Sequence, residues 1–230
     1  ILSACVFAFV VFLAAGTQSK AAVNMGVKQT GAGSSYVDLA WDAQLGAGHY
    51  HTQFSQDGKN WIDMDNSSSP SESVYNLTQG ASYYARVVAY KGSHYTGTHV
   101  MIGVSETAIV STKPTEVSGL TQTAAGVNSI SMSWNASAGA ASYVIYGYIN
   151  YNWTQIGTSA TNSATITGVA ATTSTRFSVA AVKNVTGGTV TGDQCSGVEM
   201  KAIPIKVSRI AMQYYWDSLK EAKYIWTDVN

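Results

Sequence analysis

The sequence predicts an all-β protein made of tandem antiparallel β-sandwich modules. The first observation is a repeat, because Trp41, Trp134 and Trp226 lie 93 and 92 residues apart. A fixed period of that length indicates tandem modules. The second is composition: charged residues make up only 11% of the chain, and the polar remainder is rich in Ser, Thr, Asn, Gly and Tyr, which suit short strands and turns. We therefore expect one β-module copied nearly three times.

Each of the three tryptophans ends a short run in which every second residue can face a core. This alternation is typical of a half-buried strand. The runs are 36–41 (YVDLAW), 129–134 (SISMSW) and 222–226 (AKYIW).

Two prolines mark the module boundaries. Pro114 and Pro204 lie 90 residues apart in similar contexts, and proline ends a strand because it cannot donate to the ladder. The predicted organisation is an export signal over 1–21, a first module over 22–112, a second over 113–203 and the truncated start of a third over 204–230.

The interior of the two complete modules also repeats. Tyr50 follows Trp41 by nine residues, and Tyr143 follows Trp134 by nine. In the first module a turn containing Asp57 and Gly58 comes next, which predicts a hairpin because both residues tolerate positive φ. The second module continues with a similar run over 146–153 (YGYINYNW).

The run over 77–89 (LTQGASYYARVVA) resembles the Leu-x-x-Gly-x-x-Tyr-x-x-Arg-Val-x-Ala segment of fibronectin type III domains. This resemblance covers residues 23–112 and, through Trp134, Tyr143, 166–169 (ITGV) and 177–181 (FSVAA), also 113–203. It implies tandem immunoglobulin-like sandwiches of seven antiparallel strands. It also implies that Tyr83 forms a tyrosine corner, in which the hydroxyl bonds upstream backbone. Thr175 stands at that position in the second module, so its corner should be weaker.

The tail resembles the opening of a third module, with Val207 and Ile210 in a first strand and Trp226 in the second. Two strands cannot bury a face of their own, so we expect the tail to be disordered or to lean on the second module. A rival interpretation is a short amphipathic helix from Gln213 to Lys223, which the tryptophan period disfavours.

The first 16 residues carry no charge and precede Ser19-Lys20-Ala21, a pattern typical of signal-peptidase cleavage. We expect an export signal that lacks its basic n-region, and a secreted or cell-surface protein. The alternative is an uncleaved anchor, although 16 residues fall short of the roughly 20 that span a bilayer. Once Cys5 is removed with the signal, Cys195 is the only thiol, so no intramolecular disulfide is expected.

Charge and motifs argue against two broad classes. Lys+Arg and Asp+Glu number 13 each, so no basic field exists to bind nucleic acid. No nucleophile elbow, zinc-protease motif or phosphate loop occurs, and we expect neither an enzyme nor a cofactor. Asp63 and Asp65 are expected to share one side of a strand, and we interpret them as solvated carboxylates.

All four histidines lie in the first module. In the topology that the resemblance implies, the segment with His49 and His51 approaches the loop with His94 and His99. Convergence and scattered surface positions both stay open, and because the spacing fits no common metal pattern we assign no metal ligand.

Outward-facing aromatic residues are the best indication of binding. If Tyr143 faces the core, alternation sends Tyr146 and Tyr148 outward, and the same argument sends Tyr84 and Tyr90 outward in the first module. Such rings can stack on sugars or anchor a protein. The alternative is that tyrosine simply favours strands.

We therefore expect a monomeric, non-catalytic extracellular segment that acts as a spacer or adhesive element, with a glycan or a protein at the cell surface as its partner. The alternative is a set of accessory modules of a secreted polysaccharide-degrading enzyme. An animal receptor ectodomain is a third hypothesis, disfavoured by the missing disulfides.

Overall fold

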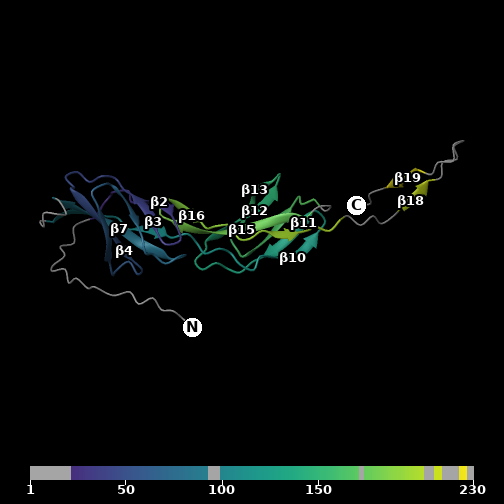
Figure 1. Cartoon of the computed structure of the whole chain (residues 1–230), viewed down its shortest axis with the longest axis horizontal. Helices are drawn as coiled ribbons and strands as arrows, with labels where there is room; N and C mark the ends of the chain where they lie inside the picture. Colours follow the sequence, from purple (N-terminus) through teal and green to yellow (C-terminus); the bar gives the residue numbers. More distant parts are fainter. Residues whose placement is uncertain (1–21, 93–98, 171–173, 205–209, 214–222, 227–230) are drawn as a thin grey trace, which may run out of the picture.

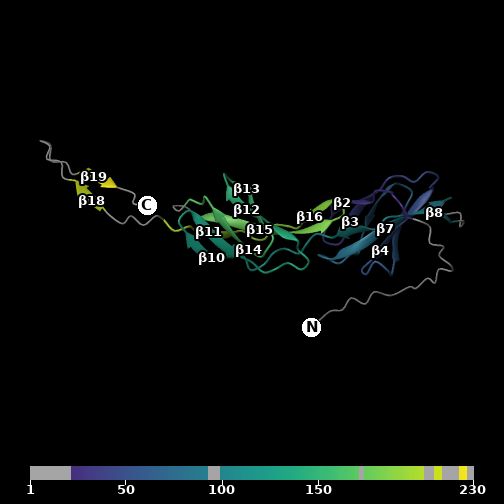
Figure 2. The ribbon, with the colours of Figure 1, turned by 180° about the vertical axis from the view of Figure 1, so that it is seen from behind.

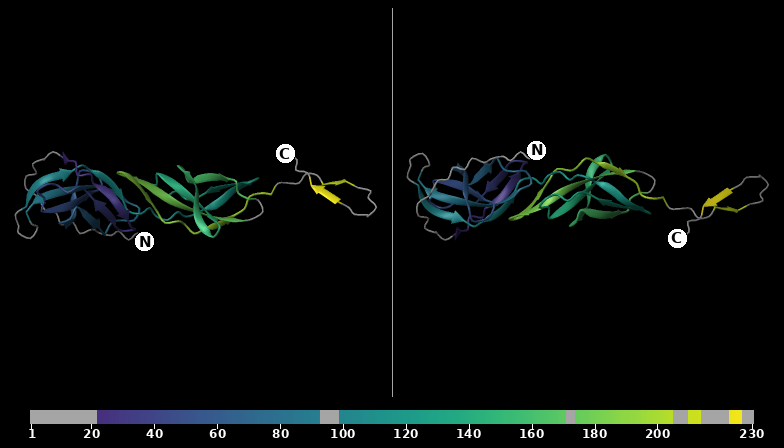
Figure 3. Two further views of the ribbon diagram at one scale, coloured as in Figure 1. Left: turned by 90° about the horizontal axis from the view of Figure 1, so that it is seen from above. Right: turned by 90° about the horizontal axis from the view of Figure 1, so that it is seen from below.

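The computed structural model describes residues 22–92, 99–170, 174–204, 210–213 and 223–226. These residues form two β-sandwich modules that follow one another along the long axis of the molecule (Figure 1; Figure 3). Within the described residues, no helix is long and apolar enough to cross a membrane. The expected export signal over 1–21 lies outside them.

The first module packs two antiparallel sheets face to face. One sheet has the order β2-β3-β6, and the other has the order β5-β4-β7-β8, in which β9 also pairs with β7. A short β1 adds to the free edge of β8 in parallel. The strands are β1 Ala22–Val23, β2 Lys28–Ala32, β3 Val37–Ala40, β4 His49–Ser55, β5 Ile62–Ser67, β6 Ser71–Val74, β7 Ser82–Lys91, β8 Val100–Ser105 and β9 Ala108–Ser111.

The second module repeats this order. Its smaller sheet is β10-β11-β14, and its larger sheet is β13-β12-β15-β16, with β17 also on β15. The strands are β10 Thr121–Gly126, β11 Ser129–Ser133, β12 Ser142–Ile149, β13 Asn152–Ser159, β14 Ser163–Thr167, β15 Thr175–Val185, β16 Gly188–Thr191 and β17 Val198–Met200. The expected all-β class with tandem sandwiches is confirmed.

Two further strands lie in the tail, where β18 (Ile210–Gln213) pairs antiparallel with β19 (Lys223–Trp226). Gln213 and Lys223, the ends of the rival helix, are therefore paired strand residues, and the residues between them lie outside the described part. The module boundaries themselves, including a truncated third module, stay a prediction.

A tryptophan and a tyrosine hold the two sheets of each module together. Trp41 meets Tyr50 edge to face with ring centroids 5.4 Å apart, and Trp134 meets Tyr143 in the same way at 5.3 Å. All four rings are buried. Each tyrosine hydroxyl also accepts a backbone N–H from the loop before its own strand, from Gln44 in one module and Ser137 in the other, both at 3.0 Å. The repeat seen in sequence thus persists at the level of single hydrogen bonds.

The tyrosine corner is present in the first module. The Tyr83 hydroxyl accepts the backbone N–H of Thr78 at 3.0 Å, five residues upstream, as the resemblance implied. Thr175 occupies the first residue of β15 in the second module and has no ring that could reach back. Residues 171–173, which precede it, are not described.

A glutamine joins the two sheets at one edge of each module. Gln29 bonds both the N–H and the C=O of Ser111, at 2.9 and 2.7 Å, and Gln122 bonds the same two groups of Lys201, at 3.1 and 2.9 Å. Both glutamines stand at a register shift in the first strand of their sheet. A primary amide both donates and accepts hydrogen bonds, as a backbone peptide group does, so each side chain takes the place of a neighbouring strand.

The last strand of each module is split, and a side chain fills the gap. Ser105 Oγ accepts the N–H of Val87 at 2.8 Å, and Cys195 Sγ accepts the N–H of Val179 at 3.2 Å. Cys195 is buried and unbridged. Its position in the core gives it a structural role.

The two glutamine links should differ in strength. Gln29→Ala should lower the free energy of unfolding of the first module by about 2 kcal/mol, because Ser111 is buried and would keep an unpaired N–H and C=O. Gln122→Ala should cost the second module only about 0.5 kcal/mol, because water can reach the exposed Lys201. Urea unfolding of both variants measures the difference, and equal losses would contradict this account.

Candidate binding faces

The larger sheet of each module has one face on the core and one face outside, and the outside faces are the candidate binding faces. Along β12, Tyr143 and Ile145 are buried while Tyr146 is half-buried and Tyr148 is exposed. In β7, Tyr83 and Ala85 are buried while Tyr84 and Arg86 lie outside. The alternation expected from the sequence therefore places these tyrosines on the outer faces.

On the first module, a chain of polar contacts crosses the outer face. Arg86 Nε donates to Gln53 Oε1 at 2.8 Å, and Gln53 Nε2 donates to Asp63 Oδ1 at 2.6 Å. The Arg86 guanidinium also lies 4.1 Å from the centre of the Trp61 ring, in a cation–π contact. Asp63 Oδ2 lies 3.9 Å from His51 Nδ1. These contacts hold five side chains of three strands in one arrangement.

The environment shifts the ionisation of this network. The interaction with His51, the largest cause, holds the pKa of Asp63 below its usual value. Burial lowers the pKa of Arg86 and raises that of Tyr90. The cause is the same for both, since burial disfavours the charged form.

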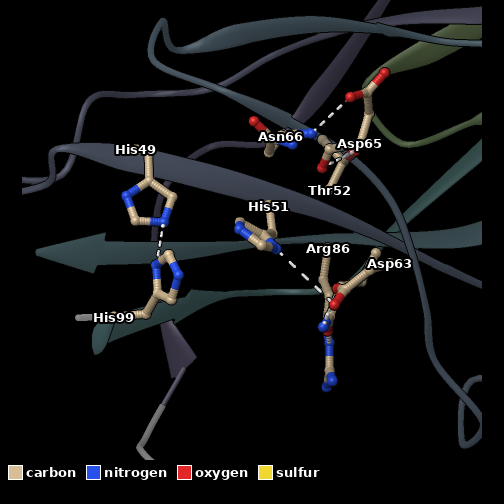
Figure 4. A network of polar contacts seen from close by, with 9 residues as sticks. His49, His51, Thr52, Asp63, Asp65, Asn66, Arg86 and His99 are labelled. Atoms are coloured by element: carbon tan, nitrogen blue, oxygen red, sulfur yellow. Dashed lines mark hydrogen bonds and ion pairs between the residues drawn. The ribbon is translucent and has the colours of Figure 1, made fainter. Parts of the chain in front are cut away.

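Histidines continue the network along the sheet (Figure 4). His49 Nε2 lies 3.2 Å from His99 Nδ1, and His49 Nδ1 lies 2.9 Å from the carbonyl oxygen of Gly92. A carbonyl only accepts, so Nδ1 of a neutral His49 carries the proton and Nε2 accepts from His99. Three of the four histidines therefore converge as the topology allowed, and His94 lies outside the described residues.

The described residues contain no group of three His, Cys, Asp or Glu side chains arranged to hold a metal ion. The two aspartates also separate. A register shift between Thr52 and Gln53 puts Asp63 opposite Gln53 and Asp65 opposite the core-facing Thr52, and Figure 4 shows the two carboxylates pointing apart. The expectation that they share one side of the strand was wrong, because a β-bulge reverses the alternation.

The two tyrosines expected to bind on the first module have different surroundings. Tyr84 is 38% exposed. Tyr90 is half-buried, stacked on His49 at 5.2 Å between ring centroids and 4.9 Å from His51. Tyr90 is thus part of the histidine cluster, which leaves Tyr84 as the open ring of this face.

The second module presents a different surface. Tyr148 and Trp153 face each other across β12 and β13, with ring centroids 5.2 Å apart, and they are 39% and 37% exposed. Tyr151 stands at the tip of this hairpin and is 89% exposed. No Asp, Glu, Lys, Arg or His occurs between Glu116 and Arg176, so the hairpin that carries these rings is itself uncharged.

Sequence reasoning did not single out Trp61 and Trp153. They lie 92 residues apart, which is the period of the core tryptophans, and each stands at the start of the strand that follows the hairpin turn. Trp61 packs on Arg86. Trp153 packs closely against Gly197. A Cβ atom added to Gly197 would lie 2.8 Å from Trp153 Cη2 and 3.5 Å from Arg176 Nε. The tryptophan period, applied to the hairpin, would have found both.

No family model and no curated protein matches this chain. Among solved structures, the chain is similar to the FN1–FN3 domains of chicken CNTN1, with 14% identity, a TM-score of 0.44 and coverage of 79% of this chain and 68% of that one. It is also similar to a segment of two fibronectin type III domains from chicken tenascin, with 17% identity, a TM-score of 0.39 and coverage of 76% and 97%.

These scores are low, so the strand order, the repeated core pairs and the tyrosine corner carry the assignment. The two modules are fibronectin type III-like repeats. A fold alone does not set the function, which depends on what the surfaces of these modules present.

Removing the Asp63 carboxylate should make stability depend less on pH. The folded pKa of Asp63 is depressed, so its contribution is fully present above the unfolded value of 3.8 and is lost as the pH falls through the folded value. Because the side chain is 57% exposed, Asp63→Asn should cost no more than about 1 kcal/mol at pH 7.

Urea unfolding of both proteins from pH 7 down to pH 2.5 tests this, and the difference should shrink below pH 4. Asp65→Asn is the matched control, because it removes one charge from the same strand without touching His51 or Gln53. A difference that stays constant with pH would contradict the role assigned to Asp63.

Proposed function

We propose that this chain is a non-catalytic segment of a secreted or cell-surface protein, in which two fibronectin type III-like modules form a stiff spacer that presents adhesive surfaces. The single observation that supports it best is a set of contacts that fixes the second module on the first. The apolar, uncharged segment over 1–16 supports export, and sequencing the N-terminus of the mature protein checks its removal.

The connection between the modules is short. Thr112 is buried in the first module and bonds the carbonyl of Thr78 at 2.8 Å, while Val117 is already part of the core of the second. Only residues 113–116 lie between them, and Pro114 restricts the backbone further. A linker of this length limits how far the modules can rotate.

A hairpin of the second module extends onto the first. The N–H of Thr186, in the turn between β15 and β16, donates to the carbonyl of Ile109 in β9 at 2.8 Å, and Thr186 Oγ1 accepts the Ile109 N–H at 2.7 Å. Figures 1 and 2, seen from opposite sides, both place β16 beside β2 and β3. Thr186 therefore continues the ladder of the first module for one residue.

Two lysines strengthen the same contact. Lys183 is almost fully buried, and its ammonium donates to the carbonyl of Gly80 in the first module. Burial lowers its pKa. Lys113 Nζ lies 2.6 Å from Asp193 Oδ1, but that pair is exposed and contributes little. The buried lysine and the Thr186 bonds are the main restraints.

The same pair of modules could separate a catalytic domain from its substrate-binding partner in a secreted polysaccharide-degrading enzyme. The exposed Tyr148 and Trp153 rings favour this second candidate, because a hydrolase would use such rings to hold its polymer. A domain with paired carboxylates elsewhere in the reading frame would support it over the adhesive spacer.

Weakening these restraints should loosen the modules without unfolding them. Spin labels at Ser71→Cys and Thr167→Cys, one in each module, should give one narrow distance distribution by double electron–electron resonance. Adding Lys183→Met and Thr186→Ala should broaden it clearly, because both inter-module side-chain bonds are lost.

The control carries Lys59→Met and Thr158→Ala, which alter exposed side chains that make none of these inter-module hydrogen bonds, and should leave the distribution narrow. If the distance distribution between the two labels were already broad when Lys183 and Thr186 are unchanged, the stiff spacer would be contradicted.

A further inference from the structure

The hairpin β12–β13 carries a group of exposed aromatic rings whose chemistry the spacer function does not use. Tyr148 and Trp153 lie side by side on its outer face, and Tyr151 projects from its tip. We propose that these three rings form a binding site for a neutral polysaccharide. The inference names the ligand class of the proposed adhesive role and does not depend on the stiffness of the spacer.

The conformation of Tyr151 is the first argument. Asn150 and Tyr151 are the only residues between Ile149 and Asn152, which pair, and their φ angles are +49° and +65°. A two-residue hairpin turn with two positive φ angles favours Asn followed by Gly. Tyrosine at the second position is strained. Because the Tyr151 ring is 89% exposed, packing within the module does not offset that strain. Contact with a ligand would explain why an aromatic residue occupies this position.

The shape of the site is the second argument. Trp153 lies against Gly197, where a Cβ would come within 2.8 Å of the indole. Glycine at that position leaves room for the indole to lie close to the segment just before β17. The Tyr148 ring stands at 60° to it. Two fixed rings at an angle offer apolar surfaces to successive sugar rings of a chain, whose faces are apolar and whose edges carry hydroxyls.

Charge is the third argument, and it selects the ligand class. No Asp, Glu, Lys, Arg or His occurs between Glu116 and Arg176. The hairpin instead exposes hydrogen-bonding groups of both kinds near the rings, from Asn150 in its turn and from Gln155 on the same face of β13 as Trp153. Arg176 lies at the border of the site, and Glu199 is its register partner on β17, so the border adds no net charge. A ligand of many neutral hydroxyls matches this surface better than a charged one.

The first module supplies an internal comparison. Its equivalent tryptophan, Trp61, is covered by the Arg86 guanidinium, and its hairpin turn is closed by Asp57, which accepts the N–H groups of Lys59 and Asn60 at 2.8 Å. The repeat thus kept the tryptophan in both modules, but among the described residues the cation–π contact covers it only in the first, and Trp153 is 37% exposed.

The test is retention of the whole chain in gels containing a polysaccharide. The probes are xylan, β-1,3-glucan, mannan and hydroxyethyl cellulose as neutral polymers, with alginate and heparin as charged ones. We expect retardation by at least one neutral polymer and by neither charged one. Tyr148→Ala and Trp153→Ala should each weaken it about tenfold, whereas Tyr75→Ala, which removes an exposed ring outside the hairpin, should not.

Two further variants separate binding from folding. Tyr151→Gly should raise the melting temperature of the second module by a few degrees, because glycine relieves the strain at positive φ, and should still weaken retention. Gly197→Ala should displace the Trp153 ring and weaken retention with no aromatic residue removed.

The proposal would be overturned if no neutral polymer retarded the chain, or if only the charged polymers did. It would also be overturned if Trp153→Ala or Tyr151→Gly were retarded by the neutral polymer as strongly as the unchanged chain. None of these outcomes bears on the distance distributions that test the spacer, so the two can fail separately.

Discussion

The contact between the tryptophan that follows β3 or β11 and the tyrosine of β4 or β12 is the constraint on which each module depends. Trp41 with Tyr50, and Trp134 with Tyr143, join the two sheets across the core at nearly the same distance and angle. Once the tyrosine is fixed inward, the pleat sends the next residue outward. His51 and Gln53 in one module, and Tyr146 and Tyr148 in the other, therefore reach the outer face because of a buried contact on the opposite side of the same strand.

The fold could be predicted from sequence because its signals are periodic and local. Trp41, Trp134 and the run around Tyr83 each place one strand, and the structure uses them as expected. The candidate sites were harder, because irregularities decide them. The register shift beside Gln53 turns Asp63 and Asp65 apart, and no alternation rule anticipates a β-bulge. Tyr90 was expected as an open ring, but the neighbouring histidines cover it. Trp61 and Trp153 did carry the period, yet they stood beside turns, where aromatic residues are easily attributed to packing.

The two outer faces show how one scaffold supports different surfaces. In the first module the polar side chains satisfy one another, from Arg86 through Gln53 to Asp63. Such a face is rigid, and a ligand would have to replace existing bonds to gain new ones. In the second module Tyr146 stands in place of Gln53, with Gln155 and Ser178 as its register partners, and Tyr148 and Trp153 lie exposed farther along the same face. The same backbone thus presents a closed polar network in one copy and open apolar rings in the next.

A chain with so few charged residues has few charges with which to keep the exposed edges of its sheets from pairing with other chains. Sheets expose unpaired N–H and C=O groups at their edges, and many proteins discourage pairing there with lysine or other charges. This chain has only 13 basic and 13 acidic residues, and it uses uncharged groups instead. On β9, Gln29 hydrogen-bonds the backbone N–H and C=O of Ser111, and Thr186 hydrogen-bonds those of Ile109. In addition, β1 pairs with β8. The Thr186 contact between the modules therefore also closes an edge of the first, so the hydrogen bonds on which the proposed spacer depends are the same ones that protect this edge from pairing.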